Sequence, residues 1–483
     1  MKVLFVFKSE NFLAPLGLCA VSAAARRAGH ETALCEMKTQ DVLGRVAGYR
    51  PDVVAYSSST GEVKHYLAVN SSVKERFPEV FAIMGGPHPT FYPDVVQHGR
   101  LDAICRGEGD EAFPEVLAAL AVGRPVAGID NIMTPQSRSL CSMRNLVEDL
   151  DALPFPDVSL LYENTPMGSY PLKSVITSRG CPYNCSYCFN ASWRRIYAGK
   201  GKAVRRNSVD YVIDEIDFIR TKWPLSFVKF YDDIFTYAAD DWLEEFSEKY
   251  KRRIGLPFFI LTRADLLNED MVRLLKTAGC HTISMSIEAG NPRVRLEVLN
   301  RDMSDEQIIR AHLLCKRYGI HTFTNCIVGL PDTQISHDIE SIDLSIRSKV
   351  TWIEFPIFHP YPQTELGQRT IDRGLYSGDY TRMHTSYMYQ SPLTCFSRAQ
   401  VNAQKNITVL GPVAIVFPWL RWIIVNVAIY LPHNVIYTLM YYVTKMYVFR
   451  TRIYVTRTSL VNSLRIFARS LKQELFRHEN SAG

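Results

Sequence analysis

Three cysteines lie close together in the stretch SRGCPYNCSYCFN, which spans residues 178–190. Cys181, Cys185 and Cys188 follow the spacing C-x3-C-x2-C. Thiolates are soft ligands that select zinc or iron–sulfur centres. A structural zinc site needs a fourth ligand, whereas three thiolates can hold three irons of a [4Fe–4S] cluster and leave the fourth iron open. The spacing favours such a cluster; the alternatives are a zinc site completed by a distant histidine, or three ordinary cysteines.

Other residues able to bind ligands end short apolar runs that indicate β-strands in the middle of the chain. The runs cover residues 173–178, 227–233, 258–263, 281–288, 321–329 and 352–358. Helical patterns separate them, which predicts a partial (β/α)6 barrel. The residues at the strand ends are Asp232, Asp233, Arg263, Glu288 and Gly329. Because barrel active sites occupy the carboxyl rim, we expect these residues to converge with the cysteine loop, which follows the first strand. Alternatively, the two aspartates cap a helix and Glu288 forms a buried ion pair.

The first 120 residues also alternate strand and helix patterns, which predicts a flavodoxin-like parallel sheet. Ligands of such sheets lie at the carboxyl ends of the strands. Small and polar residues stand at those ends, and we take the following as candidate cofactor contacts: Ser58, Ser59, Thr60, Gly85, Gly86, Gly107, Glu108 and Gly109. The alternative is a set of tight turns in a domain that holds no ligand.

The stretch TSRGCPYNCSYCF resembles the cluster loop of the radical S-adenosylmethionine (SAM) enzymes. The resemblance implies that SAM chelates the open iron and that an electron cleaves it to a 5′-deoxyadenosyl radical. FYDDIF, SIEAGN and IVGLPDTQ resemble further motifs of the family. They assign Asp232 or Asp233 to the SAM amino group, Ser286 and Glu288 to the ribose or methionine moiety, and Gly329 to the adenine. Two departures stand out, because the family more often has glycine at the positions of Asp332 and Gln363.

The order of Rossmann-like domain, linker and barrel resembles the cobalamin-binding class of this family, as do GHETALCEM, GGPHPTFYPD and RGEGDEAFPE. The D-x-H-x-x-G motif, which supplies a histidine to cobalt elsewhere, does not occur, and we expect His88 to be a loop residue. The resemblance implies methylation of an unactivated carbon, with radical cyclisation or rearrangement as the alternative. It also implies a small-molecule or lipid-like substrate and an electron donor such as flavodoxin or ferredoxin.

We expect a cobalamin-binding domain over residues 1–135, a linker over 136–168, the barrel over 169–385 and a basic helical region over 386–483. From Lys405 onward the chain carries ten Lys or Arg against two Glu, so this tail is +8 and the rest of the chain is −2. Its aromatic residues favour a membrane interface. We therefore expect either peripheral membrane contact through residues 407–457 or a helical subdomain packed on the barrel.

Composition limits the other readings. Hydrophobic residues make up 47% and charged residues 22% of the chain, and eleven cysteines occur with no secretory signal, which favours a globular protein in a reducing, cytoplasmic compartment. We expect no nucleic-acid partner. Methylthio transfer to tRNA would need a second cluster and an RNA-binding module, and a non-enzymatic cobalamin- or redox-responsive protein would not need the cysteine loop and acidic rim that this chain keeps.

Overall fold

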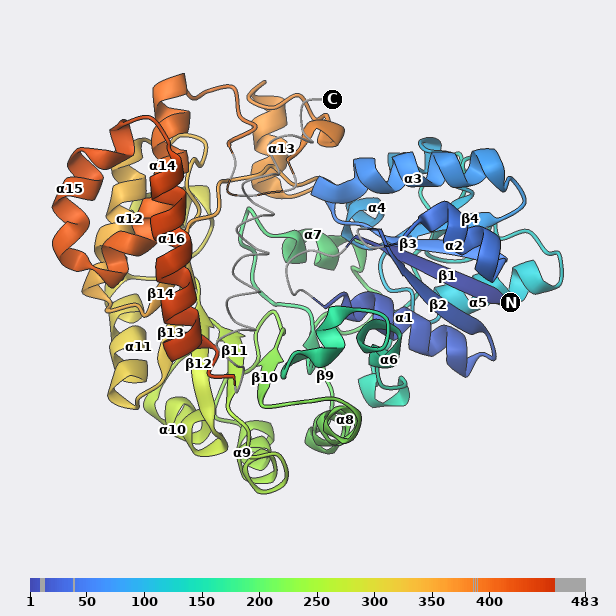
Figure 1. Ribbon diagram of the computed structural model, residues 1–483, viewed down its shortest axis with the longest axis horizontal. Coiled ribbons are helices and arrows are strands. Elements are labelled where there is room, and N and C mark those ends of the chain that lie inside the picture. Colours follow the sequence, from blue (N-terminus) through green and yellow to red (C-terminus); the bar gives the residue numbers. More distant parts are fainter. Residues whose placement is uncertain (9–13, 38–39, 385, 387, 389, 457–483) are drawn as a thin grey trace. The chain divides into compact units, whose positions relative to one another are not determined.

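The computed structural model describes residues 1–8, 14–37, 40–384, 386, 388 and 390–456 (Figure 1). It divides into two compact units. The first comprises Met1–Ser169, Ser178–Tyr211 and Pro360–Thr385, and the second comprises Tyr170–Thr177, Val212–His359 and Ser386–Gly483. By this division the cysteine loop belongs to the first unit, and the linear domain bounds that we expected stay a prediction.

The first unit contains the flavodoxin-like, mainly parallel sheet that the sequence predicts. Its strands are β1 (Lys2–Phe7), β2 (Glu31–Glu36), β3 (Val53–Ser57), β4 (Phe81–Gly85), β5 (Ala103–Cys105) and β6 (Ile132–Met133). They lie in the order β2-β1-β3-β4-β5-β6, parallel except for β6. The principal helices between them are α1 (Leu16–Arg27), α2 (Val42–Tyr49), α3 (Val63–Arg76) and α5 (Ala112–Ala121). Because β1, β3, β4 and β5 are almost wholly buried, ligands can reach this sheet only at the strand ends.

Shorter elements complete the first unit. They are α4 (Pro87–Phe91), α6 (Val158–Tyr162), α7 (Phe189–Ile196), α13 (Glu365–Asp372) and the small antiparallel pair β8 (Ser178–Arg179) and β9 (Arg205–Arg206).

The second unit contains the predicted partial barrel. Its strands are β7 (Leu172–Val175), β10 (Phe227–Phe230), β11 (Phe258–Thr262), β12 (Cys280–Met285), β13 (His321–Asn325) and β14 (Trp352–Glu354). All are parallel, and each pairs with its neighbour in the sequence, from β7 to β14. The helices that follow or separate them are α8 (Val209–Lys222), α9 (Asp241–Arg253), α10 (Glu269–Ala278), α11 (Asp305–Arg317) and α12 (Ile335–Arg347). Each of the six predicted strands is present.

Local sequence explains where these helices begin and end. Asp240 and Asn268 accept hydrogen bonds from the first turns of α9 and α10, and Ser304 forms a capping box with Gln307 at the start of α11. Such caps satisfy backbone N–H groups that have no partner inside the helix. Gly279 ends α10 in the left-handed conformation that glycine adopts without strain.

The C-terminal helices pack on the barrel. They are α14 (Arg398–Val416), α15 (Arg421–Asn426) and α16 (Val435–Val448), with the short turns η7 (Pro418–Leu420), η8 (Ala428–Tyr430) and η9 (Phe449–Ile453). α14 lies against α12, β14 and α16 (Figure 1), and the Tyr454 ring stacks edge-on against Phe227 at the start of β10. The helical subdomain predicted as one alternative is therefore present. Within the described ranges, no helix is both long and apolar enough to cross a membrane.

Candidate active site

The cysteine loop is a compact turn between β8 and α7. The backbone N–H of Cys188 donates to the carbonyl oxygen of Cys185 over 3.1 Å, and α7 begins immediately after Cys188. Cys185 is buried, whereas Cys181 and Cys188 are half-buried. In the described part of the chain no three Cys, His, Asp or Glu side chains gather closely enough to hold a single metal ion. In a cubane each thiolate binds a different iron, so three ligands on one loop fit a cluster without converging on one point.

Two residues outside the C-x3-C-x2-C motif shape this loop. The Arg194 guanidinium donates to the backbone carbonyls of Cys181 and Tyr183 and to the side chain of Asn184. Gly180 has φ = +92°, and a Cβ on it would lie 2.0 Å from the carbonyl oxygen of Ala203. The position therefore excludes any side chain, and the loop path depends on both residues.

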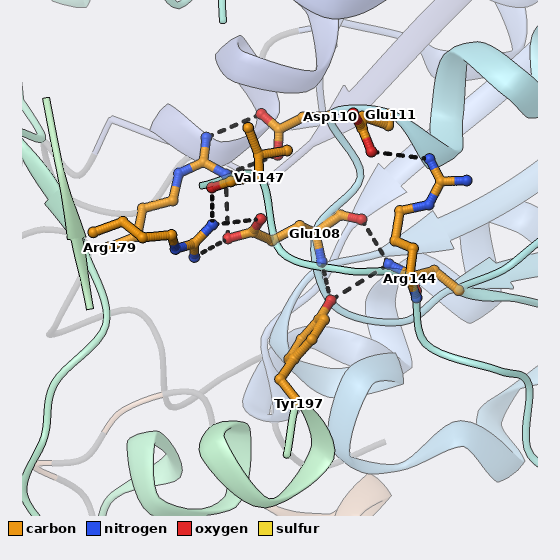
Figure 2. Close-up of polar contacts among 9 residues, drawn as sticks. Glu108, Asp110, Glu111, Arg144, Val147, Arg179 and Tyr197 are labelled. Atoms are coloured by element: carbon orange, nitrogen blue, oxygen red, sulfur yellow. Dashed lines mark hydrogen bonds and ion pairs between the residues drawn. The ribbon is translucent and has the colours of Figure 1, made fainter. Parts of the chain in front are cut away.

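A network of ion pairs fastens the loop to the end of β5 (Figure 2). Arg179, two residues before the first cysteine, binds Asp110 through two hydrogen bonds of 2.8 and 3.0 Å. Arg205 binds Glu108 through two hydrogen bonds of 2.6 and 3.0 Å, and Arg179 also reaches Glu108 over 3.3 Å. We call these four residues the arginine–carboxylate lock. Burial acts to raise the pKa of Asp110, but the Arg179 guanidinium holds that pKa below its ordinary value.

Tyr197 makes a second contact with the turn that follows β5. Its hydroxyl oxygen accepts the backbone N–H of Glu108 over 2.9 Å, and burial raises the pKa of this phenol. Gly107 has φ = +76°, and a Cβ on it would collide with the Tyr197 hydroxyl. Of the cofactor contacts that we expected, Glu108 thus belongs to the lock and Gly107 lies against Tyr197, and their part in binding cofactor stays a prediction.

The ends of β3 and β4 form a neutral edge of small groups. Ser58 is buried and donates its backbone N–H to Gly85 over 2.9 Å. Gly86 has φ = +96°, and a Cβ on it would lie 2.8 Å from the Ser58 nitrogen, so the two turns touch only because Gly86 has no side chain. Ser59 is exposed and Thr60 is buried. These residues could receive a broad uncharged ligand, and that role stays a prediction.

His88 does not lie in a loop, as we expected, but inside the short helix α4. It is buried, its Nδ1 lies 3.3 Å from the Thr60 hydroxyl, and its ring packs on Tyr92. The sequence misled because prolines flank the histidine, yet Pro87 occupies the first helical turn, where proline fits. Burial lowers the pKa of His88 to about 4, so the ring is neutral at physiological pH.

In the second unit, Asp232 fastens the ends of β7 and β10. One oxygen of its carboxylate accepts both the backbone N–H and the hydroxyl of Thr177, each over 2.9 Å. Asp232 is buried, whereas the next residue, Asp233, is exposed. The two adjacent acids therefore differ, because Asp232 links two strand ends and Asp233 is exposed.

The remaining strand ends carry both charges and a strained turn. Arg263 at the end of β11 is buried and binds Asp265 through two hydrogen bonds of 3.0 and 2.9 Å. Ser286 accepts a hydrogen bond from Asn325 over 3.2 Å. Glu288 has φ = +68°, which is unusual for a residue with a side chain. Strain of this kind is often kept at functional sites, and the part of Glu288 in the SAM site stays a prediction.

Gly329 at the end of β13 allows helix α14 to approach closely. It has φ = +68°, and a Cβ on it would lie 3.0 Å from the amide carbon of Gln404. Gln404 is buried, and within the described residues its Oε1 has no hydrogen-bond partner. Asp338 accepts a hydrogen bond from the backbone of Gly329, and burial raises the pKa of its carboxyl to about 8. Sequence reasoning missed Gln404 and Asp338 because neither lies in a strand-end motif.

The two glycine positions at which this chain departs from the resembled family keep the backbone that glycine favours. Asp332 has φ = +64° and Gln363 has φ = +59°. The carbonyl oxygen of Gln363 accepts hydrogen bonds from Ser192 and Arg195 of α7, behind the cysteine loop. The departures therefore exchange side chains without altering the left-handed conformation at either turn.

Comparisons with known proteins agree with this geometry. Residues 175–344 match the Radical SAM superfamily model and residues 2–117 match the B12 binding domain model. The chain is 27% identical to an uncharacterized methyltransferase of Pyrococcus horikoshii, covering 80% of this chain and 85% of the relative. It is also 27% identical to the hopanoid C-3 methylase of Methylococcus capsulatus, covering 76% and 70%.

A solved structure is similar as well. The radical SAM methyltransferase TsrM of Kitasatospora setae, with cobalamin and a [4Fe–4S] cluster bound, superposes with a TM-score of 0.63 at 18% identity, covering 83% of this chain and 81% of that one. The two matched models show that the chain carries a B12 binding domain and a radical SAM domain, as the sequence predicts. The [4Fe–4S] cluster, SAM and cobalamin are the cofactors of this class.

Proposed function

We propose that this protein is a cobalamin-dependent radical SAM methyltransferase that adds a methyl group to an unactivated carbon of a small-molecule or lipid-like substrate. When bound, the cluster and SAM supply a 5′-deoxyadenosyl radical, and cobalamin supplies the methyl group. The observation that carries the proposal is the cysteine loop, whose conformation Gly180 and Arg194 fix, in a chain that matches both domain models.

The proposal gives separate roles to the three loop cysteines and to the two adjacent aspartates. Cys181, Cys185 and Cys188 would hold three irons. The exposed Asp233 would accept a hydrogen bond from the SAM amino group, while the buried Asp232 holds the two strand ends in register through Thr177.

Other groups surround the cofactors in this proposal. The neutral edge at Ser58 and Gly86 would face cobalamin, and Gly329 would let the adenine lie against backbone. Arg263, Ser286 and Glu288 would complete the SAM site from the remaining strand ends.

The proposal includes partners. An electron donor such as flavodoxin or ferredoxin would reduce the cluster. A lipid-like substrate would be compatible with peripheral membrane contact through residues 407–457, a stretch with many exposed aromatic and aliphatic side chains.

The test is to purify the protein without oxygen, supply iron, sulfide and cobalamin, and measure metals and products. We expect about four irons and about one cobalt per chain. With SAM labelled in its methyl group and lipid or small-molecule extracts, we expect 5′-deoxyadenosine together with a product that carries the labelled methyl. Four irons without cobalt would contradict the cobalamin mechanism, and a cyclised or rearranged product without the label would favour the alternative reaction.

A further inference from the structure

The outer side of the C-terminal helices is apolar. Thirteen of the twenty large hydrophobic side chains that are exposed in the described chain lie between Phe417 and Val455. Trp419 and Trp422 are 77% and 68% exposed, and Ile436 is 63% exposed. Nine of the thirteen stand on η7, α15, η8 and α16, which neighbour one another or share α14 as a neighbour. We call this surface the apolar face. A concentration of this kind marks an interaction site rather than an ordinary surface.

Helix α16 is inverted relative to an ordinary surface helix, in the sense that its apolar side is exposed and hydroxyl-bearing residues are buried. Its buried residues are Thr438, Tyr441, Thr444 and Val448, and three of these four carry a hydroxyl group. Its outward side carries an apolar stripe at helical spacing, formed by Val435, Ile436, Leu439, Val443 and Tyr447. A surface helix that stood only against water would show the opposite arrangement. The outward stripe therefore needs an apolar environment other than the barrel.

Buried polar contacts hold α16 in this orientation. Glu354 of β14 accepts hydrogen bonds from Trp352 over 2.9 Å and from the Tyr441 hydroxyl, and it pairs with Lys445 over 2.8 Å. A half-exposed ion pair holds α15, since Arg421 binds Asp343 of α12 through two hydrogen bonds of 2.6 Å. Rotating α16 to hide its stripe would take Tyr441 and Lys445 away from the buried Glu354, and removing the cation from a buried ion pair is strongly destabilising. The apolar face is thus a fixed feature of the barrel unit.

The charges of this region indicate which kind of partner binds the apolar face. Residues 405–456 contain five Lys or Arg and no Asp or Glu. Lys445 and Arg421 pair with barrel carboxylates, while Arg450 and Arg452 are exposed at the end of α16. A second copy that docked symmetrically would bring the same cations together without any carboxylate from this region. An anionic bilayer supplies both an apolar interior for the stripe and negative headgroups for the arginines, and Trp and Tyr favour its interface.

We propose that the apolar face docks on the surface of an anionic lipid bilayer, with Trp419, Trp422 and the α16 stripe inserted among the headgroups. The proposal deepens the proposed function, on which it rests for its biological purpose, because it makes the substrate a lipid taken from that bilayer.

The experiment uses the full chain loaded with its cofactors and measures flotation with vesicles of phosphatidylcholine containing phosphatidylglycerol, beside vesicles of pure phosphatidylcholine. We expect the protein to float with the anionic vesicles and to lose most of that binding at high salt. The variants Trp419→Ser/Trp422→Ser and Ile436→Ser/Leu439→Ser should each bind about tenfold more weakly or worse. A matched control, Leu296→Ser/Leu313→Ser, removes exposed leucines elsewhere in the same unit and should bind like the wild type.

Several outcomes would overturn the docking surface. They are no flotation of the wild type, equal loss in the control variant, or a concentration-dependent dimer that the apolar-face variants abolish, which would make a second copy the occupant. Poor quenching of Trp419 and Trp422 by acrylamide in lipid-free protein would show that the chain covers the face itself.

Formation of 5′-deoxyadenosine is measured in the same samples. Flotation without SAM cleavage would contradict only the proposed function, and SAM cleavage without flotation would contradict only the docking.

Discussion

The carboxyl edges of the two parallel sheets carry different chemistry. At β3 and β4 the first sheet ends in Ser58 and Gly86, which are small and uncharged, and the carboxylates that follow β5 are bound to arginines of the lock. The barrel edge instead carries Asp232, Asp233, Arg263 and Glu288 at successive strand ends.

The difference matches the two cofactors of the class. A corrin is broad and presents mainly amides and apolar ring surface, so it needs close backbone approach more than charge. The amino acid part of SAM carries an ammonium and a carboxylate, and fixed charges at strand ends can orient it. In our proposal the same topological rule, ligands at the carboxyl ends of strands, thus applies to two sites that differ through their side chains.

The largest expected effect follows from removing a cluster ligand. Cys185→Ser should abolish iron–sulfur loading and lower SAM cleavage by roughly 10³-fold or more, because the cluster is the source of the electron. Iron analysis and 5′-deoxyadenosine formation measure the loss. Cys395→Ser, at an exposed cysteine outside the loop, should leave the iron content and SAM cleavage unchanged. An equal loss in this control would show that the effect is not specific to the cluster ligands.

The arginine–carboxylate lock comes next. Glu108→Ala leaves Arg205, whose side chain is only 2% exposed, without its anion, which should cost about 3–5 kcal/mol of unfolding free energy and lower the iron content. Denaturant unfolding measures the cost. Glu111→Ala breaks an ion pair with Arg144 in which the glutamate is 55% exposed, so it should cost about 0–1 kcal/mol. Similar costs for the two variants would contradict a structural lock.

Variants of the two adjacent acids, Asp232 and Asp233, should affect different properties, namely stability and SAM binding. Asp232→Ala leaves the backbone N–H of Thr177 without its acceptor and should cost about 1–3 kcal/mol of stability. Asp233→Asn changes an exposed side chain, so stability should hold while the SAM concentration needed for half-maximal cleavage rises roughly tenfold. Thermal unfolding and SAM titrations of both variants test this, and the reverse pattern would exchange the two roles.

The buried carboxyl of Asp338 should make the free energy of unfolding depend on pH. Its pKa rises on folding from 3.8 to about 8 because of burial, so the folded state holds a proton that the unfolded state loses. Stability should therefore fall as pH rises through this window, by on the order of 1 kcal/mol or more. Asp338→Asn keeps an acceptor for Gly329 and should flatten this slope. Glu215, whose pKa burial also raises to about 8, stays in both proteins, so the difference in unfolding free energy isolates Asp338; parallel slopes would contradict the assignment.

The smallest expected effect lies at the two left-handed turns. Asp332→Gly and Gln363→Gly relieve φ values of +64° and +59°, and each should stabilise its unit by about 0.5–1 kcal/mol. The shift in midpoint of urea unfolding measures the gain. Ser59→Gly, at a residue with φ of −84°, is the control and should stabilise nothing.

The sequence by itself determined the cofactor chemistry and the fold class. Cysteine spacing, the period of apolar residues and the strand-end motifs each involve residues that lie close together in the chain. They can therefore be recognised from the sequence alone. Each of the six barrel strands and the flavodoxin-like sheet could be predicted in this way, as could the strand ends at which the candidate site residues stand.

Only the tertiary structure decided what those residues do. Glu108 meets Arg205 across 97 positions and Asp110 meets Arg179 across 69, and no local pattern records such a pairing. The buried helix around His88, the link from Asp232 to Thr177 and the inverted α16 have the same origin. Whether a polar side chain binds cofactor, a neighbouring strand or nothing at all depends on which distant group the fold brings to it, and long-range contacts leave no periodic signal in the chain.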